Sequence, residues 1–499
     1  MPELANNFVL GWFHFFGFWT IASLNISNWQ IPSTFLTQGL SVGQSMAVIV
    51  IAKMLIIGFS TLIAWCGLQW HIGFTIQNRF TWGIRGSYVP LSLRVLLNFI
   101  WNAIQCWNGG RQVAVCLTAI WPQYATMRNF LPESMPTTGY EFVGFIVFWA
   151  VSIPFLWIPP ERFKVPFIII SVWCGSGMLA IMIWSLVTAG GVGPLMRTGV
   201  TIPEGSRWNA SWLMMGAINQ SIASITAGIT NGSDFSRYAK SKKSYVIGSV
   251  SCGLIVGTLV SFIGLVTTSA AQVIYGEVYW NPPDLLTAMI ANGEGTRAAR
   301  VGVFFLAFGF ALTSLFENMC GNVIAGGIDL AGLVPHYINI RRGAIITFFA
   351  AWVIQPWQLI NRAATFIQVL SSFSVFLSPI IGIMAADFYL VRGRQIRLSH
   401  LYRTNDTIYW YWNGDPAAPR SLYELNYMSF FIGFFTGGII FYVLNKLFPV
   451  EGLSEYDEVD IYGTFTTKEA ENMGVVPLEN QTEGLEGRET YAFGRPEKE

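Results

Sequence analysis

The sequence is dominated by apolar segments of the length that a membrane-spanning helix needs. A hydrocarbon core about 30 Å thick requires roughly 20 apolar residues per helix. Eleven segments meet or approach this length, at 8–38, 43–67, 87–118, 140–159, 166–189, 208–230, 245–269, 301–334, 342–356, 363–391 and 424–448. Hydrophobic residues make up 53% of the 499 positions and charged residues only 11%, against about 25% charged in soluble domains. We therefore expect an all-α integral membrane protein.

Positive charges alternate between the loops that join these segments. Fourteen lysines and arginines lie in alternate loops, at 79, 85, 162, 164, 237, 240, 242, 243, 341, 342, 392, 394, 397 and 403, and six lie in the opposite loops, at 128, 197, 207, 297, 300 and 362. Cytoplasmic loops are enriched in lysine and arginine. The pattern therefore predicts that the first set of loops and the N-terminus face the cytoplasm.

The chain divides into a membrane core and a polar C-terminal region. Residues 1–391 hold ten of the segments and are expected to form a ten-helix core. Residues 392–423 are polar and aromatic, which predicts a cytoplasmic linker before the last transmembrane helix at 424–448. The tail, 449–499, carries 13 acidic and 4 basic side chains and has no apolar periodicity, so we expect it to be disordered.

Two segments contain polar sequence where a membrane helix is normally apolar. The first carries SLNISNWQIPST at 23–34, and the sixth carries NQSIASITAGITNGSDFSR at 219–237. Unwound backbone within the membrane is tolerated only where it is buried in protein or lines a cavity. Interrupted helices at matching places are typical of transporters built from inverted repeats, which bind substrate between the breaks. We predict two inverted five-helix repeats on this basis; the alternative is that the small residues only mediate helix packing.

The third and eighth segments carry candidate substrate-binding side chains. Trp101 and Gln105 are one helical turn apart and share a face. An indole face beside a carboxamide suits a flat heterocycle with adjacent C=O and N–H groups, such as uracil or allantoin. The alternative is an interfacial tryptophan and a glutamine that bonds a neighbouring helix. Asn318 and Asn322 have the same spacing in the eighth segment.

Charged residues within the segments are candidates for ion coupling and gating. Glu317 lies beside Asn318, and an ionisable side chain inside a span usually marks an ion site or a proton relay. Pairing of Glu317 with Arg111 or a polar neighbour is the structural alternative. Asp234 and Arg237, at the end of the sixth segment, are interpreted as a helix-terminal ion pair or a cytoplasmic gate.

Six motifs occur in order along the chain. They are LNISNW in the first segment, HIGFTIQNRFTWGIRGSYVP at 71–90, W-x-x-x-Q followed by NGG in the third, IPPERFKVPF at 158–167, TNGSDFSRYAK at 230–240 and DLAGLVPHYINIRRG at 329–343. Over about residues 8–450 they resemble the nucleobase cation symporter 1 family. The chain looks most like the fungal uracil, uridine and allantoin permease branch, which also includes thiamine and nicotinamide riboside transporters.

The resemblance implies a proton symporter that works by alternating access, resides in the plasma membrane and needs no cofactor. Its partners would be the lipid bilayer and a small nucleobase-related solute, and not nucleic acid. Trp101 would stack on the substrate ring and Gln105 would hydrogen-bond it, while the sixth segment would line the pocket mostly through backbone. The substrate-binding residues carried over in this way are Ser27, Trp101, Gln105, Ser224, Thr226, Asn318 and Asn322.

The chain departs from the family pattern at several positions. Sodium-coupled bacterial relatives have Ser and Thr where this chain has Phe316 and Glu317; the change argues against sodium and makes Glu317 the candidate proton-coupling residue. Glu317 pairing with a cationic substrate would instead favour thiamine or nicotinamide riboside. The family's eleventh helix is missing, because WYWNGD at 410–415 leads almost directly into the segment that resembles the twelfth. A transport-inactive, receptor-like paralogue is a further alternative.

Two other classes of membrane protein fit the sequence less well. A membrane enzyme with a metal would need clustered histidines or aspartates, but the four histidines, at 14, 71, 336 and 400, show no metal-binding spacing. A channel would show a repeated pore loop or a ring-forming charged segment, and neither is visible. The six cysteines lie in apolar stretches without C-x-x-C spacing, so we expect buried free thiols.

Overall fold

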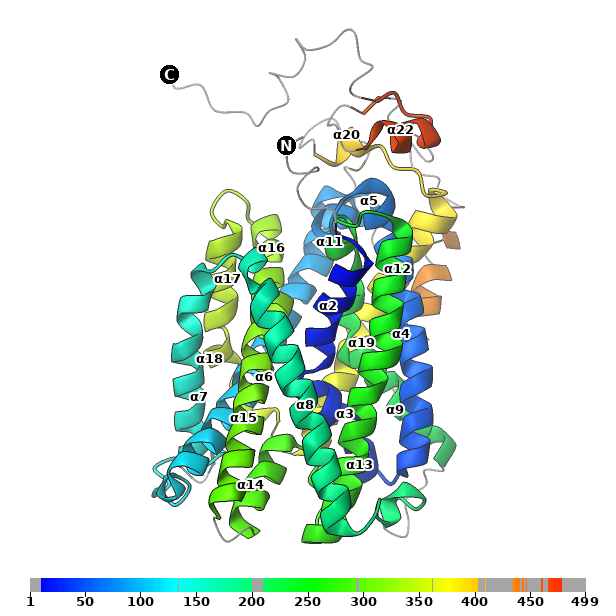
Figure 1. Cartoon of the computed structure of the whole chain (residues 1–499). Coiled ribbons are helices and arrows are strands. Elements are labelled where there is room, and N and C mark those ends of the chain that lie inside the picture. The colour runs from blue at the N-terminus through cyan, green and yellow to red at the C-terminus, as the bar shows by residue number, and fades with distance from the viewer. Residues whose placement is uncertain are drawn as a thin grey trace, which may run out of the picture.

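The computed structural model describes residues 10–132, 134–199, 210–292, 296–360, 362–402, 409, 434–439, 442–443, 446, 459–460 and 465–477. Within these residues the chain forms a bundle of long helices that run in both directions along one axis (Figure 1). The expected all-α membrane fold is confirmed.

The first five spans form one repeat. Span 1 consists of α2 (Trp12–Ser23) and α3 (Ile26–Thr37), which are separated at Leu24 and Asn25. The other four spans are α4 (Val42–Trp70), α6 (Tyr88–Ile120), α7 (Gly139–Ser152) and α8 (Lys164–Ala189). A short helix, α5 (Phe74–Gly86), connects α4 to α6.

The next five spans repeat the pattern. Span 6 is α9 (Ala210–Ser224), α10 (Thr226–Thr230) and α11 (Gly232–Ser236). Span 7 is α12 (Lys242–Ser251), the π-helical η5 (Cys252–Gly257) and α13 (Thr258–Tyr275), and the short α14 (Pro282–Asn292) follows it. Span 8 is α15 (Arg297–Asn318), the π-helical η6 (Met319–Val323) and α16 (Ile324–Leu333). Spans 9 and 10 are α17 (Ile340–Phe349) with α18 (Ala351–Ile354), and α19 (Ala363–Ala386) with the π-helical η8 (Asp387–Val391).

The positions of α5 and α14 show that the two halves are inverted. Each is a short helix that follows the second span of its half, yet they lie at opposite ends of the bundle (Figure 1). The end that holds α5 also holds the start of α2 (Figure 1). The α11–α12 and α16–α17 junctions and α20 (Leu398–Leu401), which mark three of the other basic loops, lie at the same end. The predicted inverted repeats with broken first and sixth helices are confirmed.

Six helical units in the described part of the chain are long and apolar enough to cross a membrane. They are Val42–Trp70, Gly139–Trp157, Val165–Ala189, Lys242–Tyr275, Arg297–Leu333 and Ala363–Val391. The remaining spans have features that explain why they do not meet this criterion. Spans 1, 6 and 9 are divided into shorter helices, and α6 carries the buried Arg94 and the half-buried Arg111 among other polar residues. Spans 1 and 6 and α6 are also the elements that meet at the interior site described below.

Glycines bring two pairs of helices into backbone contact. A β-carbon at Gly110 of α6 would lie 2.9 Å from the backbone nitrogen of Phe145, and one at Gly144 of α7 would lie 2.5 Å from the carbonyl oxygen of Gly110. Between α16 and α17, a β-carbon at Gly343 would lie 2.7 Å from the carbonyl oxygen of Gly327. Neither contact leaves room for a larger side chain.

Part of the acidic tail is folded, which corrects the expectation that all of 449–499 is disordered. The helix α22 (Thr467–Met473) starts with a capping box between Thr466 and Glu469. Phe465 lies edge-on to Trp70 with ring centroids 5.9 Å apart, and Phe465 and Met473 pack against the apolar cluster beside α4. A few apolar side chains at suitable spacing bury this segment although its composition is acidic.

Most of the predicted last span, 424–448, lies outside the described residues. Within it, residues 434–439 are helical. The ring of Phe434 lies 4.8 Å from that of Phe59 on α4, so this piece packs against the core. Of the predicted linker, residues 403–408 and 410–423 also lie outside the description.

We predict that Gly110→Ala lowers the thermal stability of the protein in detergent. An added methyl group must displace the α7 backbone, and such overpacking costs about 1–3 kcal/mol. The matched control is Gly302→Ala on α15, where a β-carbon meets nothing within 4 Å and the higher helix propensity of alanine should leave stability unchanged or raised. Equal melting temperatures for the two variants would show that the α6–α7 contact is not tight.

Candidate functional site

A cavity of about 210 Å³ lies where the two broken spans meet α4, α6, α12 and η6. Of the residues predicted to bind substrate, Ser27, Trp101, Gln105, Ser224 and Asn322 line this cavity, and so does Glu317. The two other predicted contacts, Thr226 and Asn318, do not line it and serve the surrounding structure.

The first break is held open by asparagine side chains. The side chain of Asn25 accepts a hydrogen bond of 2.9 Å from the backbone N–H of Asn28 and so caps α3. The Asn28 amide donates to the carbonyl oxygen of Ala22, 3.1 Å away on the far side of the break. These bonds satisfy backbone groups that would otherwise be orphaned within the membrane, and they present Ser27 to the cavity.

The second break is satisfied by hydroxyl groups. At Ile225 the backbone leaves the helical region (φ −113°, ψ 9°). Ser224 donates to the carbonyl oxygen of Ser221 at 2.8 Å, and Thr226 donates to the carbonyl oxygens of Ile222 and Ala223 at 3.1 and 2.7 Å. Thr226 therefore caps freed carbonyl groups and does not line the cavity; its assignment as a substrate contact stays a prediction.

The helix α6 places the predicted aromatic and amide groups side by side. Trp101 and Gln105 lie one turn apart, and both are buried. The indole ring of Trp101 lies 6.0 Å from the ring of Phe373 on α19, at an angle of 58°. The Oε1 atom of Gln105 has no hydrogen-bond partner among the described residues. The carboxamide is thus available to a ligand.

The π-helical η6 organises the eighth span beside α6. Asn322 donates to the Oδ1 atom of Asn318 at 3.0 Å, and Asn318 donates to the Oδ1 atom of Asn102 at 2.9 Å. Asn318 therefore supports Asn322 and does not line the cavity; its predicted role in substrate binding stays a prediction. π-Helical turns of this kind often occur at functional sites.

Glu317 is half-buried at the cavity wall and has no ionic partner among the described residues. Its Oε2 atom makes no hydrogen bond to any described residue. The alternative pairing with Arg111 is wrong, because Arg111 pairs with Glu141, at 2.8 Å, and with Asp284. The Oγ atom of Ser27 is likewise buried and unpartnered in the described structure. Since buried polar groups nearly always have partners, the unpartnered atoms of Ser27, Gln105 and Glu317 mark a place for a polar ligand or water.

An ion network lies beside the cavity, toward the end of the bundle that holds α5. Arg94 is fully buried and donates to both carboxylate oxygens of Asp329, one of them at 2.6 Å, and to Asp234 at 3.1 Å. Asp234 also accepts a bond of 2.9 Å from the backbone N–H of Phe74. Asn98 lines the cavity and donates to Asp329 at 3.0 Å, which connects the cavity to the network.

The prediction that the carboxylate of Asp234 forms an ion pair with Arg237 is wrong. The Arg237 guanidinium donates to the backbone carbonyl of Asp234 at 3.2 Å and lies over the ring of Tyr238. The carboxylate of Asp234 pairs with Arg94, which is 140 positions away in the sequence. No local spacing could indicate this partner.

A cluster of amides lies toward the opposite end. Gln30 of α3 donates to Asn108 of α6 at 3.2 Å and to Asn281, in the connection before α14, at 2.8 Å. Asn108 donates back to Gln30 at 3.2 Å. All three side chains are buried. This neutral hydrogen-bonded cluster and the charged Arg94 network lie on opposite sides of the breaks.

Sequence reasoning missed Lys53, which lines the cavity from α4. Its ammonium group donates to the Oδ1 atom of Asn28 at 3.0 Å. The sequence does contain an indication of its role: it is a single lysine within the apolar run VIVIAKMLIIGF, and ionisable residues inside spans are usually functional. Asn25 and Asn28 were also visible in the polar run of the first span.

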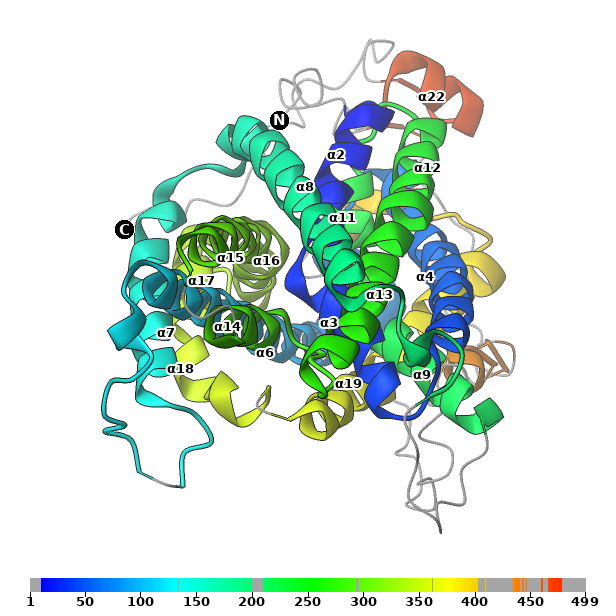
Figure 2. The ribbon, with the colours of Figure 1, turned by 60° about the horizontal axis from the view of Figure 1, so that its bottom comes forward.

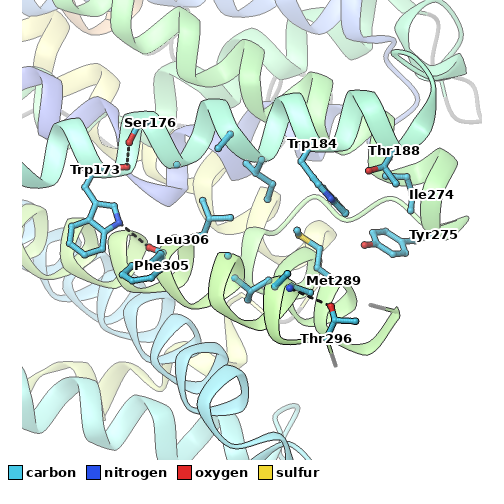
Figure 3. A pocket seen from close by; sticks show the side chains of 17 residues that line it. Trp173, Ser176, Trp184, Thr188, Ile274, Tyr275, Met289, Thr296, Phe305 and Leu306 are labelled. Carbon is cyan, nitrogen blue, oxygen red and sulfur yellow. Dashed lines mark hydrogen bonds between the residues drawn. The ribbon is translucent and has the colours of Figure 1, made fainter. Parts of the chain in front are cut away.

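A larger hollow of about 1040 Å³ lies on the outer side of the bundle, between α8, α13, α14 and α15. Figure 3 shows its walls: Trp173 donates to the carbonyl oxygen of Phe305 at 3.1 Å, and the hydroxyl of Ser176 donates to the carbonyl oxygen of Trp173 at 2.9 Å. Among the residues that the structure describes, none that lines this hollow is charged. Figure 2 shows α8 running from the edge of the bundle toward α13, and one face of α8 is exposed at Val165, Val172 and Val187. The smaller interior cavity is therefore the candidate site.

Comparison with known proteins agrees with this geometry. Residues 8–419 match a family described as "Permease for cytosine/purines, uracil, thiamine, allantoin". The chain is 30% identical to the transporter aclS of Aspergillus oryzae (92% of this chain, 88% of that protein) and 30% identical to the thiamine transporter THI72 of Saccharomyces cerevisiae (97% and 84%). Its fold matches the inward-facing conformation of Mhp1 (TM-score 0.70, 21% identity, 90% of this chain and 94% of that one) and the closed conformation of Mhp1, a nucleobase-cation-symport-1 family transporter, with bromovinylhydantoin bound (0.67, 22%, 93% and 96%).

We predict that Arg94→Gln lowers thermal stability far more than Arg237→Gln. Removal of Arg94 leaves the carboxylates of Asp234 and Asp329 buried without a cation, and breaking a buried pair in this way costs about 3–5 kcal/mol. Thermal denaturation in detergent measures the difference, and Arg94→Lys, which keeps the charge, should lie between the wild type and Arg94→Gln. Equal losses for the two glutamine variants would contradict the assignment of Arg94 as the partner.

Proposed function

We propose that this chain, which belongs to the family of permeases for cytosine/purines, uracil, thiamine and allantoin, imports a single-ring solute such as uracil or allantoin together with a proton. Uridine is a larger solute of the same class. The observation that supports this most directly is the set of unpartnered buried atoms of Ser27, Gln105 and Glu317 around one cavity beside Trp101.

The size of the cavity supports a small solute. Pockets for drug-sized ligands usually measure about 300–1,000 Å³, whereas this cavity measures about 210 Å³. Stacking of a flat ring on Trp101 would contribute about 1–3 kcal/mol, by analogy with base stacking on aromatic side chains. Gln105 and Asn322 would select the pattern of C=O and N–H groups, because a buried polar group left unpaired costs about 1–3 kcal/mol.

Alternating access would proceed by changes at the two ends of the cavity. Opening toward the cytoplasm would require the Arg94 network to separate from Asp234, since this network joins α5, α6, α11 and α16. Opening toward the outside would require the cluster of Gln30, Asn108 and Asn281 to separate. The concentration of basic loops at the α5 end supports a cytoplasmic N-terminus, and we propose the plasma membrane as the location.

Glu317 is the proposed proton-coupling group, and no covalent chemistry or cofactor is involved. A buried carboxyl without an ionic partner is stabilised in its neutral form, so uptake of a proton together with the solute offsets the cost of burying a charge. The neighbouring Phe316 packs against Phe155 and Phe163, with ring centroids 5.5 and 5.2 Å away. It offers no oxygen ligand to sodium, which favours the proton.

A second candidate is a carrier of thiamine or nicotinamide riboside. The similarity to the yeast thiamine transporter extends over 97% of the chain, and the carboxylate of Glu317 would then pair with the cationic ring of the solute. Competition by unlabelled thiamine in the uptake assay below separates this candidate from the first.

We predict saturable uptake of labelled uracil, uridine or allantoin in a host without such permeases. Gln105→Ala should lower the apparent affinity about tenfold, because it removes a buried hydrogen bond to the solute. Gln395→Ala, at an exposed position, is the matched control and should leave uptake unchanged. Wild-type uptake at the background of the empty host, with the protein present in the membrane, would indicate the transport-inactive, receptor-like alternative.

We further predict that Glu317→Gln abolishes the dependence of uptake on the proton gradient. Glutamine has nearly the same shape but cannot release a proton, so solute exchange across the membrane should persist while accumulation is lost. The control is Glu277→Gln, at an exposed position. Accumulation by Glu317→Gln that still collapses with a protonophore would assign proton coupling to another residue.

A further inference from the structure

Lys53 is the single charged residue of α4, a helix of 29 residues that crosses the membrane. A cation inside a span is costly and is normally paired. Among the described residues, Lys53 has Asn28 as its one hydrogen-bond partner, at 3.0 Å, and no carboxylate lies within ion-pair distance of it. An ammonium group has three N–H donors, so two remain for a ligand or for water.

The surroundings of Lys53 are built to hold it at the first break. Asn28, its acceptor, is itself fixed by the bond from its amide to Ala22 and by the bond from its backbone N–H to Asn25. On the opposite side, a β-carbon at Gly257, the last residue of the π-helical η5, would lie 3.2 Å from the lysine nitrogen. Glycine at this position leaves the space that the ammonium group occupies.

Lys53 and Glu317 are the two charged side chains among the described residues that line the cavity, and no ion pair joins them. The Arg94 network lies beyond Asn98, and both of its carboxylates already accept several hydrogen bonds. When Glu317 carries a proton, the charge that remains in the cavity wall is positive. A permanently cationic solute would then meet an uncompensated like charge at low dielectric.

We propose that Lys53 determines the charge class of the solute: it donates hydrogen bonds to a carbonyl or ionised ring oxygen and excludes permanently cationic rings. The proposal rests on the proposed function and narrows it. Neutral or weakly acidic heterocycles with exposed acceptor oxygens fit the cavity, whereas the thiazolium ring of thiamine and the pyridinium ring of nicotinamide riboside do not. Trp101 and Gln105 select the shape and the hydrogen-bonding pattern of the solute ring, and Lys53 selects against a positive charge on it.

The test compares inhibition of uptake by cationic and by neutral compounds. The full chain and its variants are assayed with whichever of labelled uracil, uridine or allantoin the wild type carries, and with unlabelled thiamine, nicotinamide riboside and allantoin as inhibitors. In Lys53→Met, which keeps the length of the side chain and removes its charge, the inhibition constants of the cations relative to that of allantoin should fall about tenfold or more. Lys53→Arg should stay near the wild-type ratio, and Lys243→Met, which removes an exposed lysine, should leave it unchanged.

The outcomes separate the inference from the function on which it rests. An unchanged ratio in Lys53→Met, or a uniform loss of affinity for every compound, overturns the role of Lys53 and leaves the transporter assignment standing. A wild type that prefers thiamine or nicotinamide riboside also overturns it and favours the second candidate function. A wild type present in the membrane without saturable uptake of any of the compounds overturns the proposed function and the inference together.

Discussion

The backbone groups freed at the two helix breaks are the constraint on which the rest of the structure depends. Lipid offers no hydrogen bonds, so each freed N–H and C=O must find a protein partner. At the first break the partners are amides, through Asn25 and Asn28; at the second they are the hydroxyls of Ser224 and Thr226. Because these partners are local, a cavity lies beside both breaks without exposing unpaired backbone to the membrane.

Polar groups in the interior differ in how many of their possible hydrogen bonds they make within the protein. The carboxylates of Asp234 and Asp329 are paired with the buried Arg94, and the amide of Gln30 is hydrogen-bonded to those of Asn108 and Asn281, although the Nδ2 atom of Asn281 has no partner among the described residues. The unpartnered atoms of Ser27, Gln105 and Glu317, by contrast, belong to side chains that line the cavity. The hydrogen-bonded clusters hold the helices that carry them in one arrangement, whereas the unpartnered groups at the cavity are available to a solute.

Much of the fold followed from length and hydropathy, and the site followed less completely. The polar runs inside two apolar segments correctly indicated the breaks, and the motifs correctly indicated the family, which the match over residues 8–419 confirms. Spacing placed Trp101 and Gln105 on the cavity. It could not show that Asn318 is occupied by Asn102 across a helix interface, nor that Asp234 pairs with a residue 140 positions away. Those contacts depend on tertiary packing, and the folded piece of the tail depends on a few apolar residues that average composition conceals.

The glycine contacts within the α6–α7 and α16–α17 pairs determine where the molecule can flex. Side chains packed between helices can change rotamer and allow one helix to slide past another, but backbones in direct contact have no such layer. The α16–α17 pair also packs against α6, so a displacement of one of these four helices must displace the others. Relative motion is then expected at the boundary between these four helices and the elements that carry the broken helices. The cavity is lined from both sides of this boundary, so the size of a bound solute would limit how closely the two sides could approach.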